Sequence, residues 1–482
     1  MNALPLRIKI RGRGAEKAYL IQAEQYSRGD MPVHPIEFRY FYPEMRSVFT
    51  EEAKLQKWLD VEAALAWAHA QLGSVPREAA AEIERKAKVG VVRLERVKEI
   101  EREIHHDVMA VVRALTEVCD GDAGNYVHLG ATSYDIVDTA LALQLRDALR
   151  ILEDDLLELL RVLLDQAEAH RETICIGRTH GQHALPTTYG MKFAIWAAEV
   201  ARHLDRLEEV RGRILVGKMS GAVGTMAGFG DKGFEVQRLT MERLGLRPVM
   251  IASQIVQRDR HAELQCLLAL IAGTLDKVGR EIRNLQRTEV AEVFEPFRRG
   301  QVGSSTMPQK RNPHKSERVC GLARVIRASV IPSLETIALE HERDLSNSSL
   351  ERITIPEGFI LTDYILRQAT SILRGLVFDY ENIRRNLDLT LGLCLTERVM
   401  LELVRKGVGR QEAHEMLRRL AMKCWDERRS LREVMLEDPE ASKLVTAEEL
   451  DDWLKPENYL GTAVEQVDRV IGALRGRFPQ EK

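Results

Sequence analysis

Apolar residues recur along most of the chain at spacings of three and four, the period of a helix that buries one side. The clearest early example ends at Gly73 and runs through Leu55, Trp58, Val61, Leu65, Ala68 and Leu72. Residues 131–176 contain no Gly or Pro. Within that segment, residues 138–170 carry leucines on one stripe and charges on the other, so they predict a helix about 50 Å long.

The same periodicity continues over residues 190–211, 255–295, 314–340 and 357–386. Long helices with one broad apolar face bury that face against each other, and the expected result is an elongated bundle. No run of short, alternating strands competes with this pattern. The sequence therefore predicts an all-α fold with a central bundle of long helices.

Two breaks in the pattern divide the chain. A polar loop at residues 128–135 precedes the first long helix, and shorter helices follow residues 389–394, where Gly407 and Gly409 separate two of them. We expect a small N-terminal helical domain at 31–135, the long-helix bundle at 136–390, and a C-terminal helical domain at 391–482.

Residues 1–30 differ from the rest of the chain. They are basic and lack the continuous apolar stretch of a secretion signal. We expect them to be an N-terminal extension, either a tail or the product of an upstream start codon, with Met31 as the alternative start.

Composition narrows the class of protein. The 482 residues include 70 Lys and Arg against 73 Asp and Glu, a formal net charge of −3, which does not favour nucleic-acid binding. The longest apolar run, residues 264–275, is too short to cross a membrane. Six scattered cysteines form no CxxC pair and are expected to be reduced thiols in a cytoplasmic protein.

Six polar segments interrupt the helical pattern, and each contains His or Arg. They are residues 102–107, 126–135, 176–188, 253–261, 300–317 and 342–352. Any one of them alone is equally well interpreted as a solvated loop or a helix cap. Their number favours convergence on one site.

The segment GSSTMPQKRNPHKSE (303–317), here called the opening loop, is the most informative of the six. Pro313 predicts a helix start, whose backbone N–H groups favour an anion. Lys310 adds positive charge, and Asn312 adds amide donors for a carboxylate. A serine here, Ser304 or Ser305, would act as a base or nucleophile. The alternative is a basic surface loop.

A second segment, RTHGQHALP, places His180 and His183 around a glycine. A metal site needs further ligands at fixed geometry, and none is evident. His180 is better interpreted as a general acid, with Glu317 as the carboxylate that orients it. A Ser–His–Asp hydrolase is disfavoured because GxSxG is absent from the opening loop.

GSSTMPQKRNP resembles the signature loop of the fumarase/aspartase superfamily, whose members eliminate fumarate. The segments RTHGQHALPTTYGMKFA, HLGATSYDIVDTA, SQIVQRDRHAE, ERDLSNSSLERI and FRYFYPEM resemble its purine branch. The resemblance covers about residues 36–480. It implies β-elimination of fumarate from adenylosuccinate, giving AMP, and from SAICAR, giving AICAR. It also implies a homotetramer whose active sites are each shared by three subunits, with no cofactor and no metal.

Matched position by position, the resemblance implies Ser304 as the base and His180 as the acid, with Glu317 paired to it. Lys310 and Asn312 match the positions that hold the substrate carboxylate. The other implied substrate-binding positions are Arg39, Tyr40, His106, Asp107, His128, Thr132, Ser133, Thr179, Gln254, Arg343, Ser348 and Arg352. Of these, Arg39, Tyr40, Arg343, Ser348 and Arg352 match positions around the nucleotide phosphate and base.

Two alternatives stay open at this point. Another lyase of the superfamily, or an enzyme like 3-carboxymuconate cycloisomerase, has a closely similar signature loop. A non-catalytic helical scaffold is the alternative from another class, and the presence of Ser304, His180, Lys310 and Glu317 argues against it.

Overall fold

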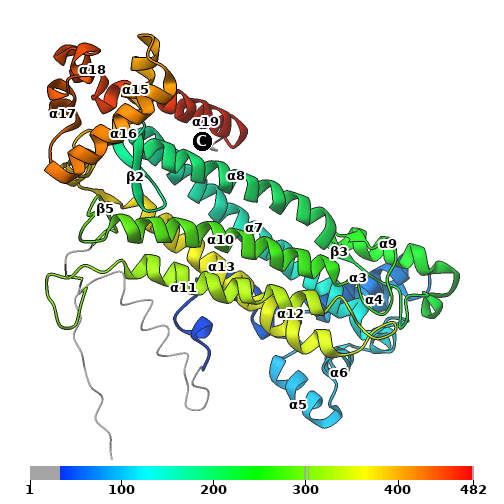
Figure 1. The fold of residues 1–482 in the computed structure, drawn as a ribbon. Coiled ribbons are helices and arrows are strands. Elements are labelled where there is room, and N and C mark those ends of the chain that lie inside the picture. The colour runs from blue at the N-terminus through cyan, green and yellow to red at the C-terminus, as the bar shows by residue number, and fades with distance from the viewer. Residues whose placement is uncertain (1–32, 298–299, 302, 480–482) are drawn as a thin grey trace, which may run out of the picture.

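The computed structural model describes residues 33–297, 300–301 and 303–479. Within these ranges the chain is an elongated bundle of long helices with a smaller group of helices at each end (Figure 1). The all-α prediction is confirmed. The predicted extension at residues 1–30 lies outside the described residues.

Five long helices run side by side along the molecule (Figure 1). They are α7 (Ser133–Ala169), α8 (Tyr189–Ile214), α10 (Asp259–Leu285), α11 (His314–Ala328) and α13 (Ser346–Arg374). At 1.5 Å per residue, the 37 residues of α7 span about 55 Å. Its leucine stripe, including Leu152, Leu156, Leu159 and Leu163, is at most 1 % exposed and lies in the main core.

The N-terminal group consists of helices that pack around the beginning of α7, and all but the 21-residue α3 are short. They are η1 (Pro35–Glu37), α2 (Pro43–Val48), α3 (Glu51–Gln71), α4 (Arg77–Lys86), α5 (Leu94–Ile104), α6 (Asp107–Val118) and η2 (Ala123–Tyr126). Between α8 and α10 lie η3 (Ala227–Lys232) and α9 (Gly233–Leu244), and α9 packs on α3. A second core unites α3 to α6 with α9 and the start of α7.

The C-terminal group begins after α12 (Val330–Glu335) and α13. It contains α14 (Tyr380–Asp388), η4 (Leu393–Leu395), α15 (Thr396–Arg405), α16 (Arg410–Glu427), α17 (Leu431–Glu437), η5 (Ala441–Lys443), α18 (Ala447–Trp453) and η6 (Pro456–Tyr459). Helices α15 to α18 have their own core. The last helix, α19 (Ala463–Arg477), packs against α8 and joins the main core through Val467 and Ile471.

We propose the three-part division of the chain as its domain organisation. Its support is the three separate cores, with two segments that cross between them. The beginning of the described chain contributes Met45 to the main core, and α19 returns to the bundle from the C-terminal group. Segments near both ends of the described chain thereby pack against the bundle.

The few strands form three two-stranded sheets. The largest is the antiparallel hairpin of β1 (Ile174–Thr179) and β2 (Gln182–Thr188). The others pair β3 (Val216–Gly217) with β4 (Arg247–Pro248), and β5 (Val293–Phe294) with β6 (Val377–Phe378). The helical pattern did not predict the hairpin, which carries one of the six polar segments.

Three of the predicted helical ranges were wrong at their ends. Within the predicted range 255–295, helix α10 ends at Leu285. The ten residues that follow form a turn and the short strand β5. The range 314–340 breaks at Ser329 between α11 and α12. The range 357–386 begins too late and runs too long, since α13 starts at Ser346 and ends at Arg374.

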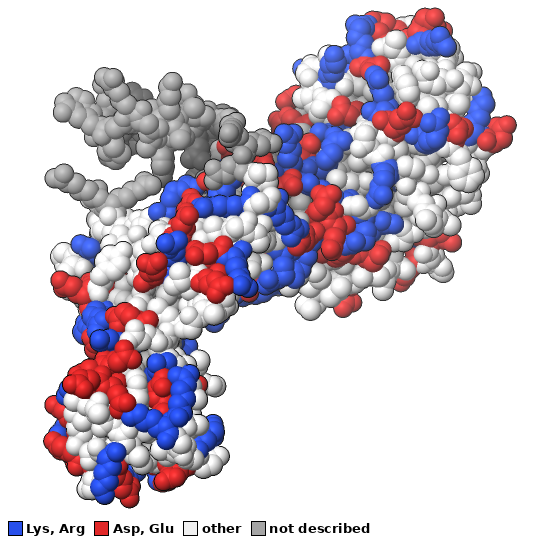
Figure 2. Space-filling model, turned by 90° about the horizontal axis from the view of Figure 1, so that it is seen from above, with Lys and Arg blue, Asp and Glu red and all other residues white. Residues whose placement is uncertain are grey.

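Charged side chains of both signs are interleaved over the surface shown in Figure 2, as the near-neutral composition predicts. In the described part of the chain no helix is long and apolar enough to cross a membrane. All six cysteines are unpaired.

Candidate active site

The opening loop holds Ser304 in a distinctive environment. The Ser304 Oγ accepts hydrogen bonds from the backbone N–H groups of Met307, at 3.1 Å, and Thr306, at 3.3 Å. Two N–H donors aimed at one hydroxyl oxygen stabilise negative charge on that oxygen. Ser305, by contrast, is exposed and accepts no such pair within the described residues. The geometry therefore favours Ser304 as the serine that can lose a proton.

The loop is folded back on itself by close backbone contacts. The Asn312 Nδ2 donates to the Gly303 carbonyl at 2.9 Å, and the Gln286 side chain on the α10 C-cap donates to the Arg311 carbonyl at 2.9 Å. A Cβ atom at Gly303 would stand 2.1 Å from the Lys310 carbonyl oxygen. Glycine is therefore required at 303 for this closure, and one amide hydrogen of Asn312 is already used inside the loop.

One prediction about this loop was wrong. The start of α11 was expected to offer its N–H groups to an external anion. Instead the buried Glu295 carboxylate accepts from the backbone N–H of Ser316 at 2.5 Å and from that of Lys315 at 3.3 Å. The anion at this helix start belongs to the chain itself.

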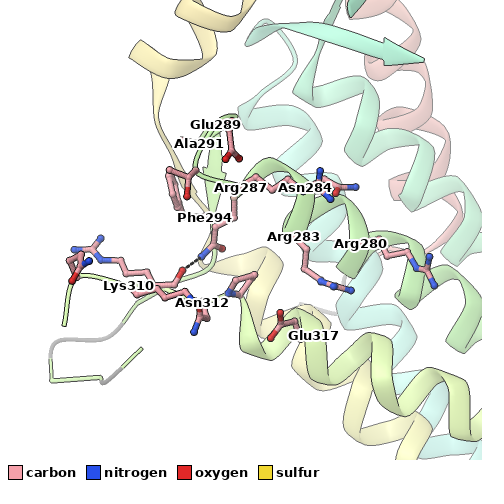
Figure 3. A pocket seen from close by; sticks show the side chains of 15 residues that line it. Arg280, Arg283, Asn284, Arg287, Glu289, Ala291, Phe294, Lys310, Asn312 and Glu317 are labelled. Carbon is pink, nitrogen blue, oxygen red and sulfur yellow. Dashed lines mark hydrogen bonds between the residues drawn. The ribbon is translucent and has the colours of Figure 1, made fainter. Parts of the chain in front are cut away.

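A cavity of about 1050 Å³ lies between the loop and the C-terminal end of α10. Lys310, Asn312 and Glu317 line one side of it (Figure 3). Arg280 and Arg283, near the end of α10, and Arg287, just beyond it, line the other. The excess of cations in an otherwise neutral protein makes this hollow suitable for an anionic ligand.

His180 lies at the tip of the β1–β2 hairpin. His180 and Gly181 form a two-residue turn with φ angles of 53° and 75°, as a type I′ turn requires. Thr179 and His180 are exposed. Deeper in the hairpin, burial and the Arg178 guanidinium lower the pKa of His183. The hairpin therefore presents His180, rather than His183, outward at its end.

The hairpin is attached to the bundle through Arg178, near its turn, and through Tyr189, just after β2. Arg178 and the Tyr189 hydroxyl both bond the buried Glu292 carboxylate, and Asn386 donates to it at 2.8 Å. Within the described residues of one chain, however, His180 makes no hydrogen bond or ion pair with Glu317. The predicted pairing of these two residues is not made inside a single chain.

A third group of predicted residues lies where α6, α7 and α13 begin, and we call it the binding cluster. Arg343 stacks on the ring of Tyr134 at 3.5 Å and donates to the Gln254 side chain at 2.9 Å. Arg352 pairs with Asp107. Ser348, Arg352 and Tyr134 line one cavity of about 360 Å³. The chain thus gathers several predicted substrate-binding residues from distant segments.

Other predicted binding residues border this cluster at helix starts. His106 is the N-cap of α6, and its Nδ1 accepts from the Met109 N–H at 3.3 Å. Thr132 caps α7 in a capping box with Asp135, and Ser133 is the first residue of that helix. His128 lies 2.6 Å from Glu62. Burial lowers the pKa of His128, but the Glu62 carboxylate outweighs it and raises that pKa overall.

Two predicted residues lie apart from this cluster. Tyr40 packs on Tyr364 of α13 at 5.6 Å between ring centres, and Arg39 lies over the Tyr40 ring. Tyr364 is twelve residues beyond Arg352 on the same helix, a rise of about 18 Å. Arg39 and Tyr40 therefore do not meet Arg343 and Arg352 within one chain.

Sequence reasoning missed several residues that build these surfaces. Arg318, on the first turn of α11, donates to the Tyr364 hydroxyl at 3.0 Å. In the binding cluster, Arg258 bonds Asp138 at 2.7 Å and Glu351 at 3.1 Å. Burial raises the pKa of Glu351 to about 7. The ion-pair contacts are long-range, and the only local signal was the polar character of segments 253–261 and 342–352.

Known proteins of similar sequence and fold agree with the arrangement described above. Residues 37–328 match a family model described as "Lyase", and residues 392–470 match one described as "Adenylosuccinate lyase C-terminus". Among solved structures, a 3-carboxy-cis,cis-muconate lactonizing enzyme from Pseudomonas putida is 38% identical with a TM-score of 0.85. That match covers 92% of this chain and 99% of the other. A fumarate lyase from Mesorhizobium sp. BNC1 is 35% identical with a TM-score of 0.84, over 92% of this chain and all of the other.

The chain therefore belongs to the lyase family of the fumarase/aspartase fold. Within this family it groups with the adenylosuccinate lyases. A curated relative of that name from Pyrococcus abyssi is 59% identical over 441 residues, which are 92% of this chain and 98% of the relative. Another from Aquifex aeolicus is 45% identical over 90% of this chain and 98% of the relative.

Proposed function

We propose that this lyase releases fumarate from adenylosuccinate, giving AMP, and from SAICAR, giving AICAR, by β-elimination. The observation that carries the proposal is the pair of backbone N–H groups on the Ser304 oxygen, beside Lys310. A serine becomes a useful base only where its alkoxide is stabilised, and this loop supplies the donors and the positive charge.

In the proposed reaction, Ser304 removes a proton from the substrate carbon next to a carboxylate. The electron pair moves into that carboxylate, and Lys310 and Asn312 stabilise the resulting dianion. The bond between the neighbouring carbon and nitrogen then breaks, and His180 donates a proton to the leaving nitrogen. Glu317 orients His180. Base and acid act at different atoms, so they are expected on different segments.

We propose that the active site is assembled from three copies of the chain within a homotetramer. One chain presents the binding cluster away from the opening loop and the hairpin tip, and His180 makes no hydrogen bond or ion pair with Glu317 within its described residues, so in this proposal no single copy holds a complete site. The faces of the bundle support association. Large apolar side chains are exposed there, among them Ile195 at 52 %, Leu270 at 51 % and Ile331 at 65 %.

In this assembly, the His180–Glu317 pair forms across a subunit interface. The remaining binding residues hold the nucleotide: Arg39 and Tyr40 from one copy, with Arg343, Ser348 and Arg352 from another. His106, Asp107, His128, Thr132, Ser133, Thr179 and Gln254 complete the contacts. We also place the protein in the cytoplasm, and its six unpaired cysteines support that location.

The test is to incubate the purified protein with adenylosuccinate and with SAICAR, and to follow the ultraviolet change and the product masses. We expect fumarate with AMP in the first case and fumarate with AICAR in the second. A parallel incubation with 3-carboxymuconate examines the activity for which the Pseudomonas putida enzyme is named. Conversion of that compound without release of fumarate from either nucleotide would overturn the proposal.

A further inference from the structure

Arg367, on α13, is surrounded by acidic side chains from three elements. Its Nε lies 2.8 Å from Asp363 on the same helix and 3.0 Å from Asp155 on α7. Its Nη1 lies 3.3 Å from Glu44 on α2. Arg367 therefore ties α2, in the first described segment of the chain, to both α7 and α13.

The two aspartates behind Arg367 form a buried carboxyl pair. The Asp363 side chain is 0 % exposed and that of Asp155 is 11 % exposed. One oxygen of each, Oδ2, is buried with no hydrogen-bond donor within the described residues. Burial, and then the facing carboxyl group, raises the pKa of Asp155, and burial also raises that of Asp363. Two facing buried carboxyl groups favour holding a proton between them, which lowers their combined negative charge beside Arg367.

The other side of Arg367 faces the segment that carries Arg39 and Tyr40. Its guanidinium lies 4.8 Å from the centre of the Tyr42 ring. The next residue on the helix, Gln368, donates to the Tyr42 hydroxyl at 2.8 Å. The rings of Tyr42 and Tyr40 both pack on Tyr364, at 5.7 and 5.6 Å. Residues on one turn of α13 thus contact both Tyr40 and Tyr42 and fix the positions of their rings.

We propose that Arg367 is a positioning residue of this enzyme: braced by Asp155 and Asp363, it fixes residues 39–44 so that Arg39 and Tyr40 face the substrate phosphate. This inference rests on the proposed function, in which those two residues bind the phosphate. Arg367 itself contacts no substrate. Its removal frees the segment, and binding of the phosphate must then order the segment at a cost in affinity.

The test compares Arg367→Gln with Arg374→Gln in the full-length protein. Arg374 is two turns further along α13 and pairs with the exposed Glu158 of α7, so it is a matched control without contact to residues 39–44. Loss of charge-assisted contacts predicts a KM for adenylosuccinate that rises about 10- to 100-fold in Arg367→Gln. We expect kcat to change less than threefold, and Arg374→Gln to match the wild type.

The substrate without its phosphate, succinyladenosine, separates positioning from a general loss of structure. Wild type and Arg367→Gln should cleave it with equal kcat/KM, because no phosphate is left to bind. An equal loss on both substrates, or an unchanged KM for adenylosuccinate, would overturn the inference. A wild type that releases no fumarate would instead overturn the proposed function.

If Arg367→Gln does not fold, Gln368→Leu and Tyr42→Phe test whether this turn of α13 positions the same segment, since each removes the 2.8 Å hydrogen bond between Gln368 and the Tyr42 hydroxyl. Each is expected to raise the KM for adenylosuccinate about three- to tenfold, with no effect on succinyladenosine. Equal values of KM in both variants and the wild type would contradict the inference.

Discussion

The binding cluster and the opening loop are built in opposite ways. In the binding cluster, Arg343 is held between Tyr134 and Gln254, and long-range ion pairs tie Arg352 and Arg258 to other helices. In the opening loop, the hydrogen bonds of the Ser304 and Asn312 side chains among the described residues go to backbone groups of the same loop, and Lys310 is exposed. In the binding cluster, contacts between helices hold the proposed substrate-binding side chains in place. The proposed base, by contrast, lies on an exposed loop.

If the site is shared between copies, as proposed, the difference explains how one chain can contain all the proposed residues without a complete site. Packed helices can fix side chains only near their own contacts. In the proposed tetramer, the exposed loop and hairpin tip would reach a neighbouring copy, and that copy would supply its own binding cluster.

The largest expected effect comes from Ser304→Ala, which removes the proposed base but leaves the loop backbone intact. We expect kcat to fall about 10³- to 10⁴-fold with substrate still bound, as loss of a general base predicts. Ser305→Ala is the control and should retain activity within a few-fold. Rates are measured by fumarate release. The reverse order of effects would show that Ser305 carries the proton.

Gly303→Ala tests whether the closure of the loop itself matters. The added methyl group would stand 2.1 Å from the Lys310 carbonyl, so the loop backbone must move. A displacement on the scale of an ångström predicts a loss of kcat of about 10²-fold. Gly321→Ala, on α11 where a Cβ meets nothing within 4 Å, is the control. Normal turnover by Gly303→Ala would contradict this role of the loop.

Glu351→Gln tests whether the binding cluster is already closed in the folded chain. The measurement is the pH dependence of the free energy of unfolding. Burial raises the pKa of Glu351 to about 7, above its ordinary value of 4.5. The folded state therefore binds the proton more tightly. The stabilisation that comes from this tighter proton binding is complete below about pH 4.5. It is lost as pH rises to about 7, so the free energy of unfolding falls by about 3 kcal/mol in total.

Urea unfolding between pH 4.5 and 8, at one protein concentration, measures this dependence. Glu351→Gln should remove most of the fall in the free energy of unfolding, and the exposed Glu335→Gln should leave it unchanged. A wild-type curve without that fall would show that the Glu351 carboxyl is ionised throughout, and the cluster would then be less tightly closed than its contacts imply.

The long helices could be predicted from the sequence because a continuous apolar stripe needs only local information. Helices α3, α7 and α8 begin and end within a few residues of the predicted ranges. The start of α13 was missed because its first turns, NSSLER, are polar and Pro356 follows inside the helix. The β1–β2 hairpin was missed because its strands do not alternate cleanly and their ends carry polar residues.

The parts of the candidate site that depend on contacts within one segment could be predicted from the sequence. The parts that depend on contacts between distant segments could not. The opening loop was identified by its own residues, and the bonds to Ser304 come from residues two and three positions away. The capping of α11 by Glu295 and the contact of Arg318 with Tyr364 join segments 20 and 46 residues apart. No local pattern contains such contacts.

The most direct test of a site shared between copies is complementation between two inactive variants. Ser304→Ala and His180→Gln are each purified, unfolded together in equal amounts, refolded, and assayed for fumarate release from adenylosuccinate. If the two residues of each site come from different subunits, random mixing restores about a quarter of wild-type activity. If the mixture is no more active than the separate variants refolded in the same way, while refolded wild type is active, the shared site is contradicted.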